Sequence, residues 1–407
     1  MTLPEIDLLT SQVSRIFRVE DITVGNPKEW IARYRGHLLT EDTVAAYDQL
    51  AEALRPYNIT PLFRREQDDK QVIFLVPSPS IPQSSSRLYI NILLFILTVF
   101  SVMLTGVDAP RELCGNPGQQ LAYMARHIFT GWPFALSMMG ILFAHEMGHY
   151  LMCRYYKVPA TLPFFIPAPL LSPLGTLGAF IAMRGIPKNK RVLFDVGVAG
   201  PLAGLIIAIP VVFIGLSLSQ TGPVLPSECG GFIEGNSVFY LFAKYLVFGK
   251  LLPQPATLGG LSPALYWLQY FFTGMPIPLN GVDVFIHPVA LAGWAGLLVT
   301  ALNLVPVGTL DGGHVAYGLF GEKARKIFPI AIGALIALSI LPSVLTLSFG
   351  AFNFSWLLWV FILFWLGNVR TQPLDDITSL DGKRRALGFF VLLVFFLLFT
   401  PIPMVGY

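Results

Sequence analysis

A chain of 407 residues with 54% hydrophobic and only 13% charged residues cannot cover an ordinary soluble surface, about a quarter of which is usually charged. The mean hydropathy of +0.64 indicates a membrane protein instead. A formal net charge of +3 is too small to indicate a nucleic-acid-binding protein, so we expect a lipid bilayer and no nucleic acid among the partners.

Residues 1–80 carry much of the charge and predict a small α+β domain. Within it, TEDTVAAYDQLAEALRP predicts an amphipathic helix with Thr40 as its N-cap and Pro56 at its end. The segments NITPLFRR and KQVIFLVPS flank the polar turn EQDD and predict a hairpin of two strands. A Pro/Ser-rich linker at 81–87 then leads to a membrane-embedded domain at 88–407.

The membrane domain contains apolar segments long enough to cross the hydrocarbon core, which takes roughly 17 to 25 helical residues. They predict a polytopic α-helical fold of about seven spans, at 88–106, 131–156, 192–218, 287–307, 327–347, 352–369 and 386–403. Between the second and third spans, TLPFFIPAPLLSPLGTLGAFIAM is rich in Pro and Gly and predicts a re-entrant loop with a short extended piece. Two short aromatic segments within 219–281 are expected to lie at the membrane interface.

The distribution of Lys and Arg predicts the orientation in the membrane. If the N-terminus is cytosolic, the cytosolic loops of the membrane domain hold far more Lys and Arg than the opposite loops. The first residues include acids and lack an apolar signal core, so we expect neither a cleaved signal nor a transit peptide. These features favour a bacterial inner membrane over a plastid membrane.

Inside the second span, AHEMGHY introduces three titratable groups into an apolar helix. His145 and His149 lie four residues apart, so both side chains can reach one metal ion from the same helix face, with Glu146 beside them. This His-Glu-x-x-His pattern is typical of zinc metalloproteases, in which the glutamate is the general acid and base. The alternative interpretation is a pair of interfacial histidines next to an unrelated acid. The pattern is rare, and ionisable groups within a span are costly, so we favour the metal site.

A catalytic zinc site usually has three protein ligands and one open position. The preferred third ligand is Asp311 in NLVPVGTLDGGHVAYG, because Pro306 disturbs the preceding helix and Gly312 and Gly313 permit close backbone approach. His314 is the competing candidate.

Two further features predict contacts with a substrate. Asn303 is a candidate hydrogen-bond donor to the scissile carbonyl or the peptide backbone, and a contact between helices is the alternative role. The extended piece GTLGAFI, with Gly175 and Gly178, is suited to receive an unwound substrate as an added strand; the alternative is a packed loop without substrate contact.

Together these motifs resemble the site-2 protease family of intramembrane zinc metalloproteases. The matching pieces are HEMGH at 145–149 and NLVPVGTLDGG at 303–313, with GTLGAFI and FDVGVAGPLAG between them. The branch is similar to the ethylene-dependent gravitropism-deficient and yellow-green proteins, and the match is specific over about 130–320. The resemblance implies cleavage of membrane proteins within or near their transmembrane helices, with one zinc ion held by His145, His149 and Asp311 and with Glu146 as the acid/base.

Two other classes of function are compatible with parts of this sequence. A metal-binding transporter or permease also uses buried His and Asp, but it predicts ionisable groups on several other spans, where they are sparse. A catalytically silent, chaperone-like relative is disfavoured because Glu146 and the three candidate ligands are all present.

Overall fold

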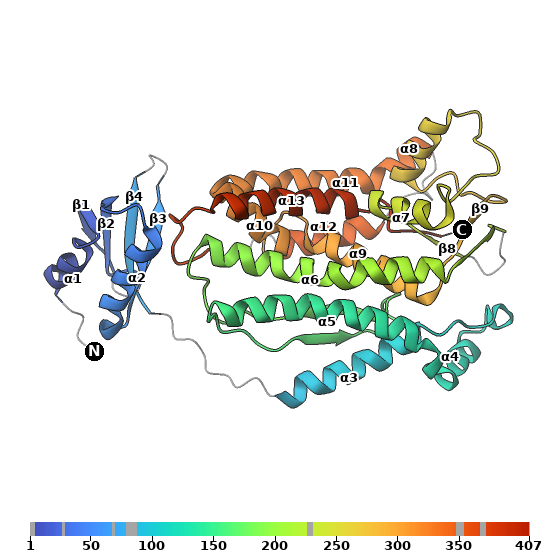
Figure 1. The fold of residues 1–407 in the computed structure, drawn as a ribbon, viewed down its shortest axis with the longest axis horizontal. Coiled ribbons are helices and arrows are strands. Elements are labelled where there is room, and N and C mark those ends of the chain that lie inside the picture. Colours follow the sequence, from blue (N-terminus) through green and yellow to red (C-terminus); the bar gives the residue numbers. More distant parts are fainter. Residues whose placement is uncertain are drawn as a thin grey trace.

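The computed structural model describes residues 5–26, 29–66, 70–78, 88–225, 231–346, 354–366 and 372–406. In Figure 1 a small α+β unit at the N-terminus lies at one end of an elongated bundle of helices. The predicted linker at 81–87 falls outside the described residues.

The N-terminal unit contains a four-stranded antiparallel sheet in the order β1-β2-β4-β3. The predicted hairpin is present as β3 and β4, in which Ile59 pairs with Pro77 and Arg65 pairs with Gln71. Strand β3 forms one edge of the sheet. The elements of this unit are α1 (Ile6–Val13), β1 (Phe17–Val24), β2 (Ala32–Leu38), α2 (Thr43–Leu54), β3 (Ile59–Arg65) and β4 (Gln71–Pro77).

The predicted N-cap of α2 is wrong by two residues. Asp42, not Thr40, caps the helix, and its side chain accepts a hydrogen bond from the Ala45 amide at 3.0 Å. The Thr40 hydroxyl oxygen instead accepts the Asp42 amide proton at 3.2 Å. Both residue types are favourable N-caps, so the backbone geometry of this turn decides between them.

The membrane domain is mostly helical. Among the described residues, four helical segments are long and apolar enough to cross a membrane: Leu88–Thr105, Ile128–Tyr155, Lys190–Ser217 and Asp311–Leu345. Val238–Phe248 and Pro288–Asn303 are shorter apolar helices. The α-helices of this domain are α3 (Leu88–Thr105), α4 (Pro117–Arg126), α5 (Trp132–Tyr155), α6 (Lys190–Ser217), α7 (Val238–Phe248), α8 (Pro263–Thr273), α9 (Pro288–Asn303), α10 (Asp311–Phe320), α11 (Ile327–Thr346), α12 (Phe354–Leu366) and α13 (Gly382–Leu398).

Three short two-stranded sheets complete the membrane domain within the described residues. The Pro/Gly-rich segment between α5 and α6 forms an antiparallel pair of β5 and β6, in which Phe164 lies opposite Phe180. The two aromatic segments within 219–281 are α7 and α8, which lie at the end of the bundle opposite the N-terminal unit (Figure 1). The short strands are β5 (Phe164–Pro167), β6 (Thr176–Phe180), β7 (Gln220–Pro223), β8 (Phe232–Glu234), β9 (Val282–Phe285) and β10 (Met404–Gly406).

Helices α5, α6 and α9 contribute most of the largest hydrophobic core. Small residues let α5 and α6 approach closely, as is common between helices in membranes. A Cβ atom at Gly148 of α5 would lie 2.5 Å from the Ala199 carbonyl oxygen of α6. This close pair positions the histidines of α5 against α6.

Candidate metal centre

Helix α5 supplies three buried polar side chains in its second half. His145, Glu146 and His149 are 4%, 5% and 7% exposed, although the helix itself is apolar. Burying titratable groups without partners is costly, so such a group of residues requires a compensating partner. The partner is Asp311, the first residue of α10.

The turn between α9 and α10 folds tightly back on itself and thereby directs Asp311 towards α5. A Cβ atom at Gly312 would lie 2.0 Å from the Leu304 carbonyl oxygen, and one at Gly313 would lie 2.3 Å from the Gly308 carbonyl oxygen. Any larger residue at either position would have to displace the backbone of this turn. The paired glycines therefore accommodate the turn itself, whereas the sequence suggested that they permit approach to another helix.

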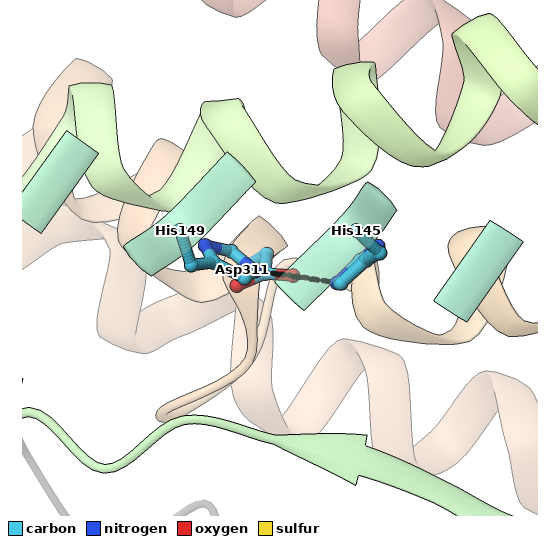
Figure 2. Close-up of side chains that lie close together, drawn as sticks. All are labelled: His145, His149 and Asp311. Carbon is cyan, nitrogen blue, oxygen red and sulfur yellow. Dashed lines mark hydrogen bonds and ion pairs between the residues drawn. The ribbon is translucent and has the colours of Figure 1, made fainter. Parts of the chain in front are cut away.

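His145, His149 and Asp311 lie close together in Figure 2, and the distances between their candidate ligand atoms describe a nearly equilateral triangle. The Asp311 Oδ2 atom lies 3.3 Å from Nε2 of His145 and 3.3 Å from Nε2 of His149, and the two Nε2 atoms lie 3.2 Å apart. Neighbouring ligand atoms of a tetrahedral zinc ion, each about 2.0–2.1 Å from the metal, are separated by about 3.3–3.4 Å. The donor set and its spacing therefore fit one zinc ion.

His314, the competing third ligand, is buried in α10 but is not part of this triangle. Among the described residues, His145, His149 and Asp311 form the group whose candidate ligand atoms all lie within 4.8 Å of one another. The His314 side chain lies against α6 instead, where a Cβ atom at Gly197 would come within 2.8 Å of the His314 Cβ atom. The geometry therefore favours Asp311.

Helix α6 orients His149. The Val196 carbonyl lies 2.8 Å from the His149 Nδ1 atom and is positioned to accept a proton from it, which leaves the Nε2 lone pair facing the triangle. A Cβ atom at Gly200 would lie 2.0 Å from the His149 Nε2 atom, so only glycine leaves room for the imidazole. This direct contact of Gly200 with a candidate ligand had no signal in the sequence.

An open cavity of about 200 Å³ gives access to the triangle. Its walls include Glu146, Asn303 and the end of β6 with the residues that follow it. The Ile181 amide, just after β6, lies near the Glu146 carboxylate. This backbone donor had no signal in the sequence.

The predicted substrate contacts differ in their distance from the centre. Asn303, at the end of α9, places its Nδ2 atom 3.3 Å from His145 Nε2. Gly175 lies against α3, because its carbonyl accepts a hydrogen bond from Ser101. Gly178 is in β6 with a φ angle of +97° and does not line the cavity, whereas Ala179 and Phe180 do.

Two other polar clusters lie outside the centre. Asp195 of α6 forms an ion pair with Arg384 of α13 at 2.6 Å and accepts a hydrogen bond from Tyr156, which makes it a link between helices. On the face opposite the N-terminal unit, the fully buried Lys244 lies 3.1 Å from Glu234 and 4.0 Å from Asp283. Burial raises the pKa of Asp283 to about 6, although Lys244 opposes this shift.

Comparison with known proteins identifies the family. Residues 133–344, about half of the chain, match the model of peptidase family M50. The chain is 30% identical over 336 residues to a rice protein (Oryza sativa subsp. japonica) named "Probable zinc metalloprotease EGY1, chloroplastic". The aligned region covers 79% of this chain and 52% of the rice protein. It is 28% identical over 416 residues to the Arabidopsis thaliana protein named "Probable zinc metalloprotease EGY2, chloroplastic", covering 99% of this chain and 66% of the relative.

A third relative, the Arabidopsis thaliana "Probable zinc metallopeptidase EGY3, chloroplastic", is 26% identical over 278 residues, covering 66% of this chain and 42% of the relative. The chain thus spans about two fifths to two thirds of the length of these relatives. No solved structure matches the chain significantly. The matched region contains both the histidine pair of α5 and the Asp311 turn, and the chain belongs to peptidase family M50.

Proposed function

We propose that the chain is an intramembrane zinc endopeptidase that hydrolyses peptide bonds within or near the transmembrane helices of membrane proteins. The observation that carries this proposal is the triangle of His145, His149 and Asp311 beside Glu146 in an apolar helix. The names of its relatives, which describe probable zinc metalloproteases, support the same activity.

The side chains divide the chemistry between them. His145, His149 and Asp311 would hold the zinc ion, which when bound polarises a carbonyl group and lowers the pKa of water to about 7. Glu146 accepts a proton from the attacking water and returns it to the leaving amine. The Ile181 amide lies near the Glu146 carboxylate, and Asn303 is positioned to donate a hydrogen bond to the substrate near His145.

We propose seven crossings, formed by α3, α5, α6, α9 with α10, α11, α12 and α13, which follow the soluble domain at 1–80 and the linker at 81–87. The N-terminal domain would then face the cytosol of a bacterial cell or the stroma of a plastid, as the excess of Lys and Arg on its side supports. An impermeant maleimide should label Lys323→Cys and Gln120→Cys from opposite sides of sealed vesicles. Labelling of both from the same side would contradict this arrangement.

The β5–β6 segment would enter the membrane beside the cavity, where an unwound substrate adds as a strand along β6. The support for this role is that Ala179, Phe180 and Ile181 line the cavity. Peptide addition at a strand edge uses main-chain hydrogen bonds and therefore accepts varied sequences.

Gly178→Pro should reduce cleavage at least about tenfold without changing the zinc content, because proline cannot adopt the φ of +97° found at this position. Cleavage of a tagged transmembrane substrate and the bound zinc are measured together. The matched control is Gly260→Pro, at a φ of +82° with open space around it in a loop far from the centre. Equal cleavage by the two variants would remove the strand-addition role.

Removal of zinc is the direct test of the proposed activity. Purified chain should cleave a tagged transmembrane substrate, lose that cleavage in a chelator and regain it on addition of zinc, because Glu146 by itself cannot activate a carbonyl. Cleavage that survives complete removal of zinc contradicts the proposal. A zinc-binding chain that cleaves no membrane substrate would favour the transporter or chaperone-like alternative.

A further inference from the structure

The loop that precedes α13 is part of the N-terminal domain in three dimensions. We refer to residues 372–381 as the docking segment. The Phe63 amide of β3 donates to the Leu374 carbonyl at 3.0 Å, and the Asp376 amide donates to the Phe63 carbonyl at 3.0 Å. The docking segment thus adds to the free edge of the N-terminal sheet, and its Ile377 side chain is buried in that domain's core.

The docking segment is also bonded to the chain that enters α6. The Leu374 amide donates a hydrogen bond to the Pro187 carbonyl at 3.0 Å, and the Asp375 amide donates one to the Lys188 carbonyl at 2.8 Å. The Asp375 side chain is fully buried and accepts the Ile377 amide at 2.9 Å, which holds the segment in shape. The segment is therefore a rigid connection between the N-terminal sheet and the start of α6.

One carboxylate in the docking segment contacts α10, which carries Asp311, and α6, which orients His149. Asp376 Oδ1 accepts a hydrogen bond from the Tyr317 hydroxyl of α10 at 2.7 Å. The same atom lies 3.1 Å from the Lys190 ammonium, at the start of α6. Asp376 is 8% exposed, so water competes little for these bonds.

Helix α10 depends on such contacts for its position. It has only ten residues, so we expect its position to depend on packing and hydrogen bonds to neighbouring segments. Its first residue, Asp311, follows a tight turn, and no side chain caps this end of the helix. Its second half is held by the hydrogen bond from the Tyr317 hydroxyl to Asp376. Helix α6, which is held through Lys190, carries the Val196 carbonyl that orients His149.

We propose that Asp376 and Tyr317 are positioning residues through which the docked N-terminal domain holds the Asp311 carboxylate against the two histidines. Zinc affinity then depends on the docking of a domain that lies outside the metal centre. A partner or ligand that releases the docking segment would lower zinc affinity without entering the cavity. This inference rests on the proposed role of Asp311 as the third ligand.

The test measures zinc affinity in the purified full-length chain by competition with a chromophoric chelator. Tyr317→Phe and Asp376→Asn should each weaken zinc binding about tenfold, at the lower end of the 10–100-fold typical for supports of metal ligands. Amide hydrogen exchange over 311–320 should become faster in both variants. Asp376→Glu, which keeps the charge, should restore part of the affinity.

The matched control is Asp48→Asn, which breaks an exposed ion pair with Lys188 across the same domain boundary but has no contact with α10. It should bind zinc as the wild type does. The inference is overturned if Tyr317→Phe and Asp376→Asn both bind zinc within twofold of the wild-type affinity. It is also overturned if Asp48→Asn loses as much zinc affinity as these two variants do.

The Asp311→Asn variant tests the ligand assignment independently of the positioning role. If Asp311→Asn binds zinc as the wild type does, the ligand assignment fails and the positioning role fails with it. If Asp311→Asn loses zinc while Tyr317→Phe keeps full affinity, the positioning role alone is overturned. Tyr317→Phe removes a single hydroxyl, and an unchanged thermal unfolding midpoint shows that any loss of zinc affinity is local.

Discussion

Glu146→Gln should lower the rate of peptide-bond cleavage by at least about 100-fold while zinc remains bound, because general acid–base catalysis contributes about 10²–10⁴-fold. Glutamine has nearly the size of glutamate, but it cannot take a proton from water. Glu146 is not one of the three clustered ligand residues, so its replacement leaves the donor set intact.

The measurement pairs turnover of a tagged transmembrane substrate with the zinc content of the same preparation. Glu52→Gln, an exposed acid on α2 of the N-terminal domain, is the control for loss of one carboxylate and should cleave normally. Retained cleavage in zinc-loaded Glu146→Gln would mean that another group transfers the proton, and the proposed chemistry would be wrong.

Asp311→Asn should weaken zinc binding by at least about 100-fold, the upper end of what loss of an outer support of a ligand typically costs. The Asp311 Oδ2 atom lies 3.3 Å from both imidazole Nε2 atoms, so this carboxylate supplies the negative charge and the third donor of the triangle. An amide is a poorer zinc ligand than a carboxylate, because it carries no charge.

His314→Gln distinguishes the two candidate third ligands. It removes a buried imidazole three residues further along the same helix and should leave the zinc stoichiometry unchanged, since His314 lies outside the triangle. Zinc content of both variants is measured after dialysis against a weak chelator. Loss of zinc in His314→Gln with retention in Asp311→Asn would reverse the assignment.

Local patterns predicted the helices and the histidine pair well. Apolar runs near 88–106, 131–156 and 192–218 correspond to α3, α5 and α6 within a few residues. The four-residue spacing of His145 and His149 also sufficed to place both rings on one face, because helix geometry is periodic. The prediction of Thr40 as the N-cap was wrong, because Asp42 suits that position equally well.

Contacts made by backbone atoms and between distant segments left no such pattern. The Val196 carbonyl can belong to any residue type, so no sequence motif indicates that it orients His149. The need for glycine at position 200 becomes visible only when α6 lies against α5. The contact of β3 with residues 372–381 joins segments that are far apart in the chain.

The sequence by itself determined the membrane class, most of the helices and the residue types of the metal centre, because hydropathy and helical period act over a few turns. The tertiary structure alone decided which of Asp311 and His314 reaches the histidines, because the tight turn after α9 sets the direction of each side chain. It also decided that the N-terminal domain is joined to α10 through Asp376, because that contact depends on how three distant segments pack together.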